Sequence, residues 1–202
     1  KVRGFLRSEN QPPNPQFMKN WGEVCGEWSK RYGKLVSRWW FDGYKTEMRD
    51  SYEDLKKETH NVDTWVQAVR SGNPKAELAF NAGAHPLLSL CTGGKLCPHQ
   101  TFTSGENHGF YQKIKKGYGK ALTPKNFPAP KGVIWHLLMP VSKGWGAGTE
   151  SKFELDVLTE RIGAINKEGG LVTLDTPISP DGRIPGEVMK TLTQLGESLP
   201  KK

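Results

Sequence analysis

Residues 28–44 read WSKRYGKLVSRWWFDGY, a helical pattern followed by a short strand and an Asp-Gly turn. The apolar side chains around its start step by three or four positions, which predicts an amphipathic helix over residues 16–32. These side chains are Phe17, Trp21, Val24, Trp28 and Tyr32. Gly33 is expected to end the helix. The β-branched and aromatic run at residues 35–41 then predicts a strand that stops at Asp42.

The same alternation of helix and strand recurs along the chain, without a repeat of fixed period. Apolar spacing predicts further helices near residues 62–69, 155–165 and 188–199. Further strands are predicted at residues 77–80, 133–139 and 171–174, with a short candidate strand at 101–103. Helices that alternate with buried strands are typical of α/β proteins with a parallel sheet.

Two architectures fit this alternation: a doubly wound sheet and a (β/α)8 barrel of the TIM-barrel type. Nucleotide-binding sheets carry a glycine-rich phosphate loop, and no GxGxxG or GxxxxGK[ST] motif follows any predicted strand. The pattern therefore favours the barrel. Length is compatible with a single domain over residues 1–202.

Polar and charged side chains gather where the predicted strands end. In both architectures ligands bind at the carboxyl edge of the parallel strands. The residues at or just beyond these ends are Asp42, Asn81, Glu106, His136 and Asp175. The sequence thus predicts a site at this edge.

Asp42 stands out because three aromatic residues precede it and Gly43 follows it. Aromatic faces such as those of Trp39 and Trp40 pack on the apolar face of a pyranose, and a carboxylate can attack or stabilise an anomeric carbon. The alternative is an ordinary turn aspartate after a core strand.

Glu106 and His136 each have two interpretations. Glu106, in the segment TSGE, is a candidate second carboxylate, since a retaining glycosidase places two carboxyl groups about 5–5.5 Å apart. It is otherwise a solvated loop residue. His136 lies in an apolar strand and is either a hydrogen-bonded core residue or part of the site.

The sequence lacks the motifs that are typical of metal sites and of serine hydrolases. The loop histidines His85, His99 and His108 form no HxH or HExxH spacing, and no CxxC or GxSxG motif is present. We therefore expect no metal and no cofactor. Cys91 and Cys97 are either bridged in an oxidising compartment or free.

The chain is basic, with a formal net charge of +8 and a pI near 9.4. Seven lysines and no acidic residue lie between Asn107 and Thr149. This lysine strip is either a solvated loop or a surface for a polyanion such as a sulfated glycan or nucleic acid. No known nucleic-acid motif is present, which disfavours nucleic acid. No apolar run approaches the roughly 18 residues of a membrane span.

Five segments in order resemble the alpha-L-fucosidase type of glycoside hydrolase. Residues 28–44 are similar to the family's strand that closes in W-x-D-G, and residues 69–83 to its next strand, which ends in Asn. Residues 101–106 (TFTSGE) are similar to its D-Y-T-A-G-E stretch. Residues 135–148 (WHLLMPVSKGWGAG) resemble its W-E-x8-W-G stretch, with His136 in place of the Glu. Residues 169–185 are similar to the segment that closes the barrel.

The resemblance implies roles for individual residues. Asp42 matches the catalytic nucleophile at the end of the fourth barrel strand, and Glu106 is the implied acid/base. The implied substrate-binding residues are Trp39, Trp40, Asn81, His85, His136 and Trp145.

On this resemblance the chain covers about the last five strands of a barrel. We expect a preceding segment or a separate chain to supply the rest, because an open sheet edge invites aggregation. The resemblance also implies an extracellular, periplasmic or lysosome-like compartment.

The expected function is that of a retaining exo-glycosidase of alpha-L-fucosidase type acting on glycan chains. The alternative is a catalytically inactive relative with a structural or a glycan- or polyanion-binding role. In either case the expected partner is a carbohydrate, sulfated and acidic glycans included.

Overall fold

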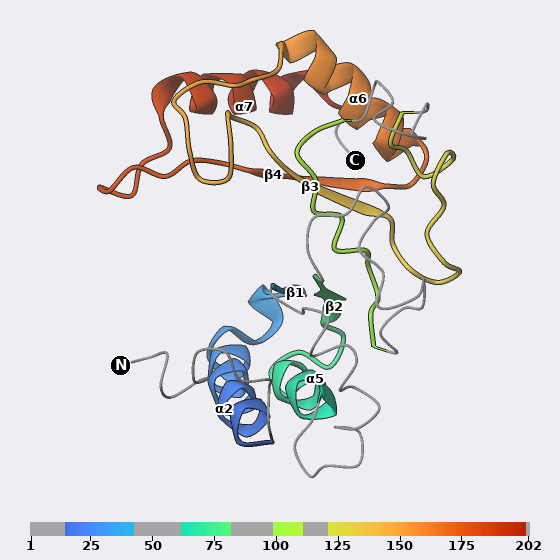
Figure 1. Ribbon diagram of the computed structural model, residues 1–202, viewed down its shortest axis with the longest axis vertical. Coiled ribbons are helices and arrows are strands. Elements are labelled where there is room, and N and C mark those ends of the chain that lie inside the picture. The colour runs from blue at the N-terminus through green and yellow to red at the C-terminus, as the bar shows by residue number, and fades with distance from the viewer. Residues whose placement is uncertain (1–14, 43–61, 82–98, 111–120, 201–202) are drawn as a thin grey trace. The chain divides into compact units, whose positions relative to one another are not determined.

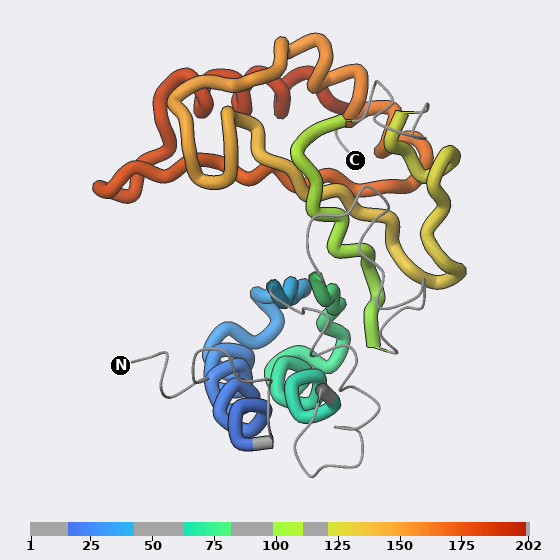
Figure 2. The backbone as a smooth tube through the Cα atoms, viewed as in Figure 1, coloured from blue at the N-terminus to red at the C-terminus, as the bar shows by residue number. Residues whose placement is uncertain are grey.

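The computed structural model describes residues 15–42, 62–81, 99–110 and 121–200 (Figure 1, Figure 2). The chain divides into two compact units. The first unit comprises Lys1–Gly83 and Leu90–Phe102, and the second comprises Ala84–Ser89 and Thr103–Lys202. Each unit has a pair of parallel strands and its own hydrophobic core. In the described ranges no helix is both long and apolar enough to cross a membrane.

The described part of the first unit places two parallel strands beside two helices. Its elements in chain order are α2 (Pro15–Tyr32), η1 (Gly33–Leu35), β1 (Arg38–Phe41), α5 (Val62–Arg70) and β2 (Glu77–Phe80). In the parallel pair Arg38 lies opposite Glu77 and Phe41 opposite Phe80. Gly33 has a φ of 52°, a left-handed conformation that glycine adopts readily at the end of a helix.

One face of the β1–β2 pair packs into a core formed with α2 and α5. Phe41 stacks on Trp65 of α5, with ring centroids 5.6 Å apart, and on Phe80 of β2 at 5.1 Å. Trp65 Nε1 also donates a hydrogen bond to the Met18 carbonyl of α2 across 2.9 Å. Because side chains alternate along a strand, Trp40 faces the side of β1 opposite to Phe41.

The second unit repeats this plan. Its described elements are β3 (His136–Pro140), α6 (Leu155–Lys167), β4 (Leu171–Asp175) and α7 (Gly186–Ser198). β3 pairs in parallel with β4, and Figure 1 shows α6 and α7 together on one side of that pair. Leu137 and Met139 of β3 are fully buried in the core that forms there.

A short extended segment adds a further parallel neighbour to β3. The Leu138 N–H donates to the Gly105 carbonyl across 3.0 Å, and the Asn107 N–H donates to the Leu138 carbonyl across 2.8 Å. Glu106 therefore lies opposite Leu138 in the ladder.

The predicted α/β class and the alternation of helix and strand are confirmed. The first predicted strand begins later than expected, since residues 33–35 form the short 3-10 helix η1 and β1 begins only at Arg38. The described sheets contain two strands each. The partial (β/α)8 barrel and the single domain over residues 1–202 stay predictions.

Candidate functional site

Asp42 and Asn81 lie side by side where β1 and β2 end. The Asn81 N–H donates to the Phe41 carbonyl across 2.8 Å, which extends the parallel ladder by one step. The Asn81 side chain is fully buried, and its Nδ2 donates to Oδ1 of Asp42 across 3.1 Å. Asp42 itself is exposed. The first unit thus presents an accessible carboxylate oriented by a buried amide.

Trp39 and Trp40 face opposite sides of β1. Trp39 packs against the helix-side core, and its Nε1 is buried without a hydrogen-bond partner among the described residues. Trp40 lies two positions before Asp42, so both point to the other face. Its ladder partner there is the small Ala79. Trp40 is therefore placed on the Asp42 side, and Trp39 is not.

Glu106 and His136 share one face in the second unit. Glu106 lies opposite Leu138, and parallel ladder partners point to the same side. His136 precedes Leu138 by two positions and points to that side as well. The buried core residues Leu137 and Met139 point to the helices instead.

Gly105 lets the segment before Glu106 approach β3 closely. Its φ is 63°, and an added Cβ would lie 1.9 Å from the His136 carbonyl oxygen. The neighbouring Thr103 is fully buried and makes two hydrogen bonds to His136 through Oγ1. It accepts from the His136 N–H across 2.7 Å and donates to the His136 carbonyl across 2.8 Å.

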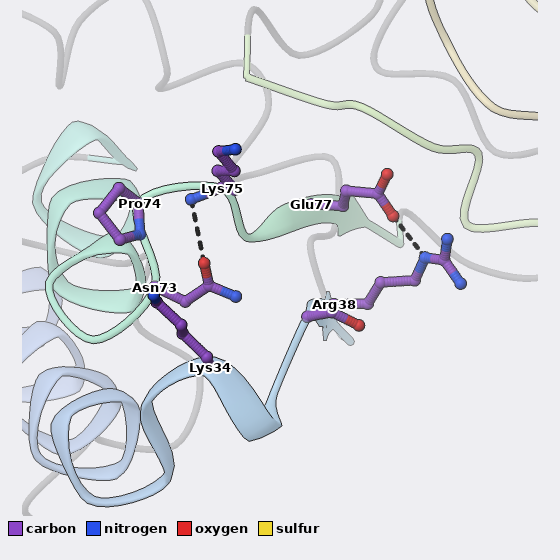
Figure 3. Close-up of a pocket in the computed structure, with 7 residues that line it drawn as sticks. Lys34, Arg38, Asn73, Pro74, Lys75 and Glu77 are labelled. Carbon is purple, nitrogen blue, oxygen red and sulfur yellow. Dashed lines mark hydrogen bonds and ion pairs between the residues drawn. The ribbon is translucent and has the colours of Figure 1, made fainter.

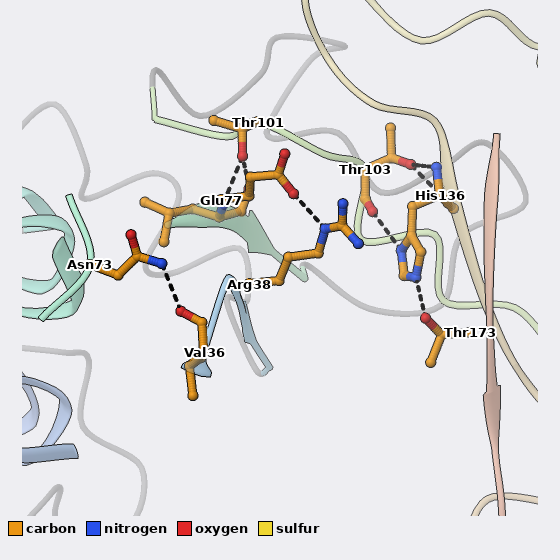
Figure 4. Close-up of polar contacts among 9 residues, drawn as sticks. Val36, Arg38, Asn73, Glu77, Thr101, Thr103, His136 and Thr173 are labelled. Atoms are coloured by element: carbon orange, nitrogen blue, oxygen red, sulfur yellow. Dashed lines mark hydrogen bonds and ion pairs between the residues drawn. The ribbon is translucent and has the colours of Figure 1, made fainter. Parts of the chain in front are cut away.

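Both nitrogens of the His136 ring have protein partners (Figure 4). Nδ1 lies 2.9 Å from the Thr103 carbonyl oxygen, which only accepts hydrogen bonds, so Nδ1 carries the proton. In the neutral ring Nε2 is then the acceptor, 2.8 Å from the Thr173 hydroxyl. The side chain is only 6% exposed. A sugar hydroxyl could bind Nε2 only by displacing Thr173.

Trp145 lies in a tight turn that follows β3. The Gly146 N–H donates to Oδ2 of Asp175, the last residue of β4, across 2.9 Å. The Ser142 hydroxyl donates to the Ala147 carbonyl across 2.6 Å. These bonds hold a partly exposed indole at the carboxyl end of the β3–β4 pair. The sequence placed Asp175 at this edge but did not predict its contact with the turn.

His108 pairs with Trp145, a contact that the sequence did not predict. The two ring centroids are 5.7 Å apart and the rings are tilted by 59°. Lys152 Nζ donates to the His108 carbonyl across 2.7 Å and lies over the Phe153 ring. Burial lowers the pKa of Lys152 from its usual value. No short-range pattern could reveal a pair of residues 37 positions apart in sequence.

Several predicted features fall outside the described residues, namely His85, Cys91, Cys97 and most of the lysine strip. The described lysines of the strip are Lys125, Lys131 and Lys143, and all three are exposed. Among the described residues no group of three His, Cys, Asp or Glu side chains could hold a metal ion.

Each unit therefore brings two of the predicted site residues together. Asp42 and Asn81 meet in the first unit, and Glu106 and His136 share a face in the second. The convergence of all four on one pocket stays a prediction.

No protein-family model and no curated protein matches the chain. Solved structures do match. The endo-fucoidan hydrolase MfFcnA4 from glycoside hydrolase family 107 is 17% identical, with a TM-score of 0.61 over 94% of this chain and 31% of that one. The endo-fucoidan hydrolase P5AFcnA from the same family is 13% identical, with a TM-score of 0.61 over 90% of this chain and 55% of that one.

Alpha-L-fucosidase isoenzyme 1 from Paenibacillus thiaminolyticus is 18% identical, with a TM-score of 0.53 over 94% of this chain and 40% of that one. The chain thus spans between about a third and about half of the length of these structures. At such identities the likeness concerns the fold alone, which resembles that of these glycoside hydrolases. It does not single out the alpha-L-fucosidase family.

Proposed function

We propose that the chain is part of the catalytic domain of a retaining glycosidase that acts on fucose-containing glycans. The observation that carries this proposal is the exposed Asp42 carboxylate, held by buried Asn81 at the carboxyl edge of parallel strands. The glycoside-hydrolase-like fold supports it. The domain is then a partial (β/α)8 barrel, completed by a preceding segment or by a separate chain.

In this mechanism Asp42 attacks the anomeric carbon and forms a covalent glycosyl-enzyme. Glu106 protonates the leaving glycosidic oxygen and then deprotonates the water that releases the sugar. Trp40 and Trp145 supply aromatic walls in this proposal, which is supported by the partial exposure of each indole near the carboxyl end of its own strand pair. We keep His85 as a sugar ligand and assign Trp39 to the core rather than to the wall.

His136 is a second candidate for the acid. The Thr103 carbonyl fixes its Nδ1 proton, which directs Nε2 toward exposed Thr173. To act as the acid, the ring first takes up a second proton from solvent at Nε2; it then donates that proton to the leaving glycosidic oxygen, which takes the place of the Thr173 hydroxyl, and returns to the neutral Nδ1–H form. If Glu106 is the acid instead, His136 keeps the substrate-binding role that the resemblance implies.

The enzyme could cleave at the ends of a glycan chain (exo action) or within it (endo action). The resemblance to alpha-L-fucosidases favours exo action, whereas the solved structures with the higher TM-scores are named as endo-fucoidan hydrolases. An exo enzyme releases monosaccharide from the first turnover. An endo enzyme shortens a polymer before any monosaccharide accumulates, and sizing the early products separates the two.

A catalytically inactive glycan-binding protein is the second candidate function. The observation that favours it is buried His136, with both ring nitrogens occupied, where the resembling family has a Glu. Carbohydrate remains the partner in that case. An extracellular, periplasmic or lysosome-like location fits both functions. In an oxidising compartment Cys91 and Cys97 can form a disulfide. Counting the free thiols of the protein, denatured without a reducing agent, shows whether they do.

Replacement of the nucleophile tests the enzyme proposal. Asp42→Gly in the native polypeptide should lower turnover of an aryl fucoside by at least about 1000-fold. Azide should restore part of the activity and yield a glycosyl azide of inverted configuration, because a small anion fills the vacated space. The matched control is Asp181→Gly, another exposed loop aspartate before a glycine, which should keep full activity.

Two results would contradict the proposal. One is unchanged turnover in Asp42→Gly. The other is a wild-type polypeptide that binds glycan without any turnover, which would favour the inactive glycan-binding protein.

A further inference from the structure

The first unit contains a cavity of about 650 Å³ at the amino-terminal ends of β1 and β2 (Figure 3). Arg38 and Glu77, the first residues of the two strands, line it. Asp42 follows the opposite end of β1, roughly 13 Å away at about 3.3 Å per residue. The cavity is therefore separate from the proposed reaction site. Its volume lies within the roughly 300–1,000 Å³ of typical ligand sites.

Positive charge predominates around the cavity. Three cations, Lys34, Arg38 and Lys75, line it together with one carboxylate, Glu77. Glu77 accepts a hydrogen bond from Arg38 Nε, which neutralises that carboxylate locally. Neither Lys34 nor Lys75 forms an ion pair with a described residue. Two ammonium groups thus remain available to an anion.

The wall between these cations is fixed by hydrogen bonds to the backbone. The Asn73 side chain is 9% exposed, and its Nδ2 donates to the Val36 carbonyl across 3.0 Å. Its Oδ1 accepts from the Lys75 N–H across 3.1 Å. Asn73 therefore ties the turn that leads into β1 to the turn that leads into β2.

The turn that leads into β2 is also held against α2 by hydrogen bonds. The Gly72 N–H donates to the Ser29 hydroxyl across 3.0 Å, and the Ser29 hydroxyl donates to the Val69 carbonyl. A Cβ on Gly72 would lie 1.8 Å from the Ser29 carbonyl oxygen, so the backbones are in direct contact. A frame held in place before binding loses little entropy when a ligand arrives.

From this geometry we propose that the cavity binds an anionic group, a sulfate or carboxylate, carried by a saccharide chain. Lys34 and Lys75 contact the anion, and the outer N–H groups of Arg38, which Glu77 does not use, donate to it. Pro74 offers an apolar surface to the sugar ring. The saccharide part rests on the proposed function, whereas the anion site does not.

The test measures binding to dextran sulfate at low ionic strength, with neutral dextran of equal length as reference. Wild type should bind the sulfated polymer only. The double variant Lys34→Glu/Lys75→Glu should weaken binding by about tenfold or more, through two lost charge-assisted contacts. Because each exposed pair is screened by salt, that difference should shrink as salt is added.

Two control variants carry the same change of charge. Lys19→Glu/Lys167→Glu alters exposed lysines that do not line the cavity and should have little effect. Lys131→Glu/Lys143→Glu alters the lysine strip and should likewise have little effect. An equal loss in all three variants, or a loss in the strip variant alone, would overturn the proposal. So would equal binding of dextran and dextran sulfate.

Inorganic sulfate identifies the source of the anion. If inorganic sulfate displaces dextran sulfate when both supply the same concentration of sulfate groups, the site binds a free anion. If it does not, the site binds the sulfate group carried by the saccharide chain. Circular dichroism of each variant checks that the fold is kept. No step of the test requires turnover, so its outcome is independent of whether Asp42 is a nucleophile.

Discussion

Asn81, fully buried at the end of β2, donates its side-chain amide to Oδ1 of exposed Asp42 across 3.1 Å. Its backbone N–H is held at the same time by the Phe41 carbonyl. Asn81 therefore cannot turn away without leaving the core. A carboxylate oriented by such a group is preorganised for attack on an electrophile, which makes the pair the central element of the candidate site.

The first prediction concerns this orientation. Asn81→Ala removes the amide that fixes Asp42 and should lower kcat by about 10–100-fold, together with a stability loss of about 1–3 kcal/mol. Steady-state kinetics and urea unfolding measure the two effects. The control Asn126→Ala removes a comparable side-chain bond, from Nδ2 to the Ala121 carbonyl at 2.8 Å. It should lose stability and keep kcat. Equal kcat in the two variants would show that Asn81 has no positioning role.

The second prediction concerns the approach of residues 103–107 to β3. Gly105→Ala places a Cβ 1.9 Å from the His136 carbonyl oxygen and forces a left-handed alanine, so the backbones must separate. We expect a loss of about 3 kcal/mol or more. Gly182→Ala has a similar φ of 81° with nothing within 4 Å of the new Cβ. It should lose only about 1–2 kcal/mol. Equal midpoints of urea unfolding would refute the close approach.

The third prediction is a pH dependence that arises from α2. Burial raises the pKa of the Cys25 thiol to about 11 from an ordinary value of 9.0. The unfolded chain releases this proton near pH 9, while the folded chain holds it until about pH 11. The contribution of this thiol to the free energy of unfolding is thus fully present below pH 9. It declines as the pH rises toward 11, by an amount on the order of 1–2 kcal/mol.

Comparison with Cys25→Ala isolates the thiol from other groups that titrate in alkali. The difference in unfolding free energy between wild type and variant should narrow between pH 8.5 and about 10.5. A difference that stays constant over this range would mean that the thiol titrates alike in both states.

Local pattern predicted the elements well because each has a strong period or a clear stop. The apolar steps from Phe17 to Tyr32 and the left-handed Gly33 defined α2 closely. The resemblance implied that Trp39 and Trp40 both bind substrate, whereas the structure packs Trp39 against the core of the first unit. A strand alternates with a period of two, so Trp40 and Asp42 share a face and Trp39 takes the other.

Long-range contacts could not be predicted in the same way. The ion pair of Arg38 with Glu77 and the ring pair of His108 with Trp145 join residues about 40 positions apart. Strand register and turn conformation set these contacts, and no short motif encodes either. The two readings of His136 also required coordinates, because only they show which groups meet its two nitrogens.

The last prediction decides which group is the acid. A general acid matters most when the leaving group is poor, because a good leaving group departs with little help from a proton. If Glu106 is the acid, Glu106→Gln should lower hydrolysis of unactivated glycosides by at least about 100-fold and largely spare activated aryl fucosides.

The matched variant His136→Asn keeps an N–H near the Thr103 carbonyl while removing the ring. With Glu106 as the acid, it should affect both substrates to a similar, smaller degree. The opposite pattern, a selective loss on poor leaving groups in His136→Asn alone, assigns the acid to His136. Equal activity of both variants and wild type on both substrates would refute both assignments.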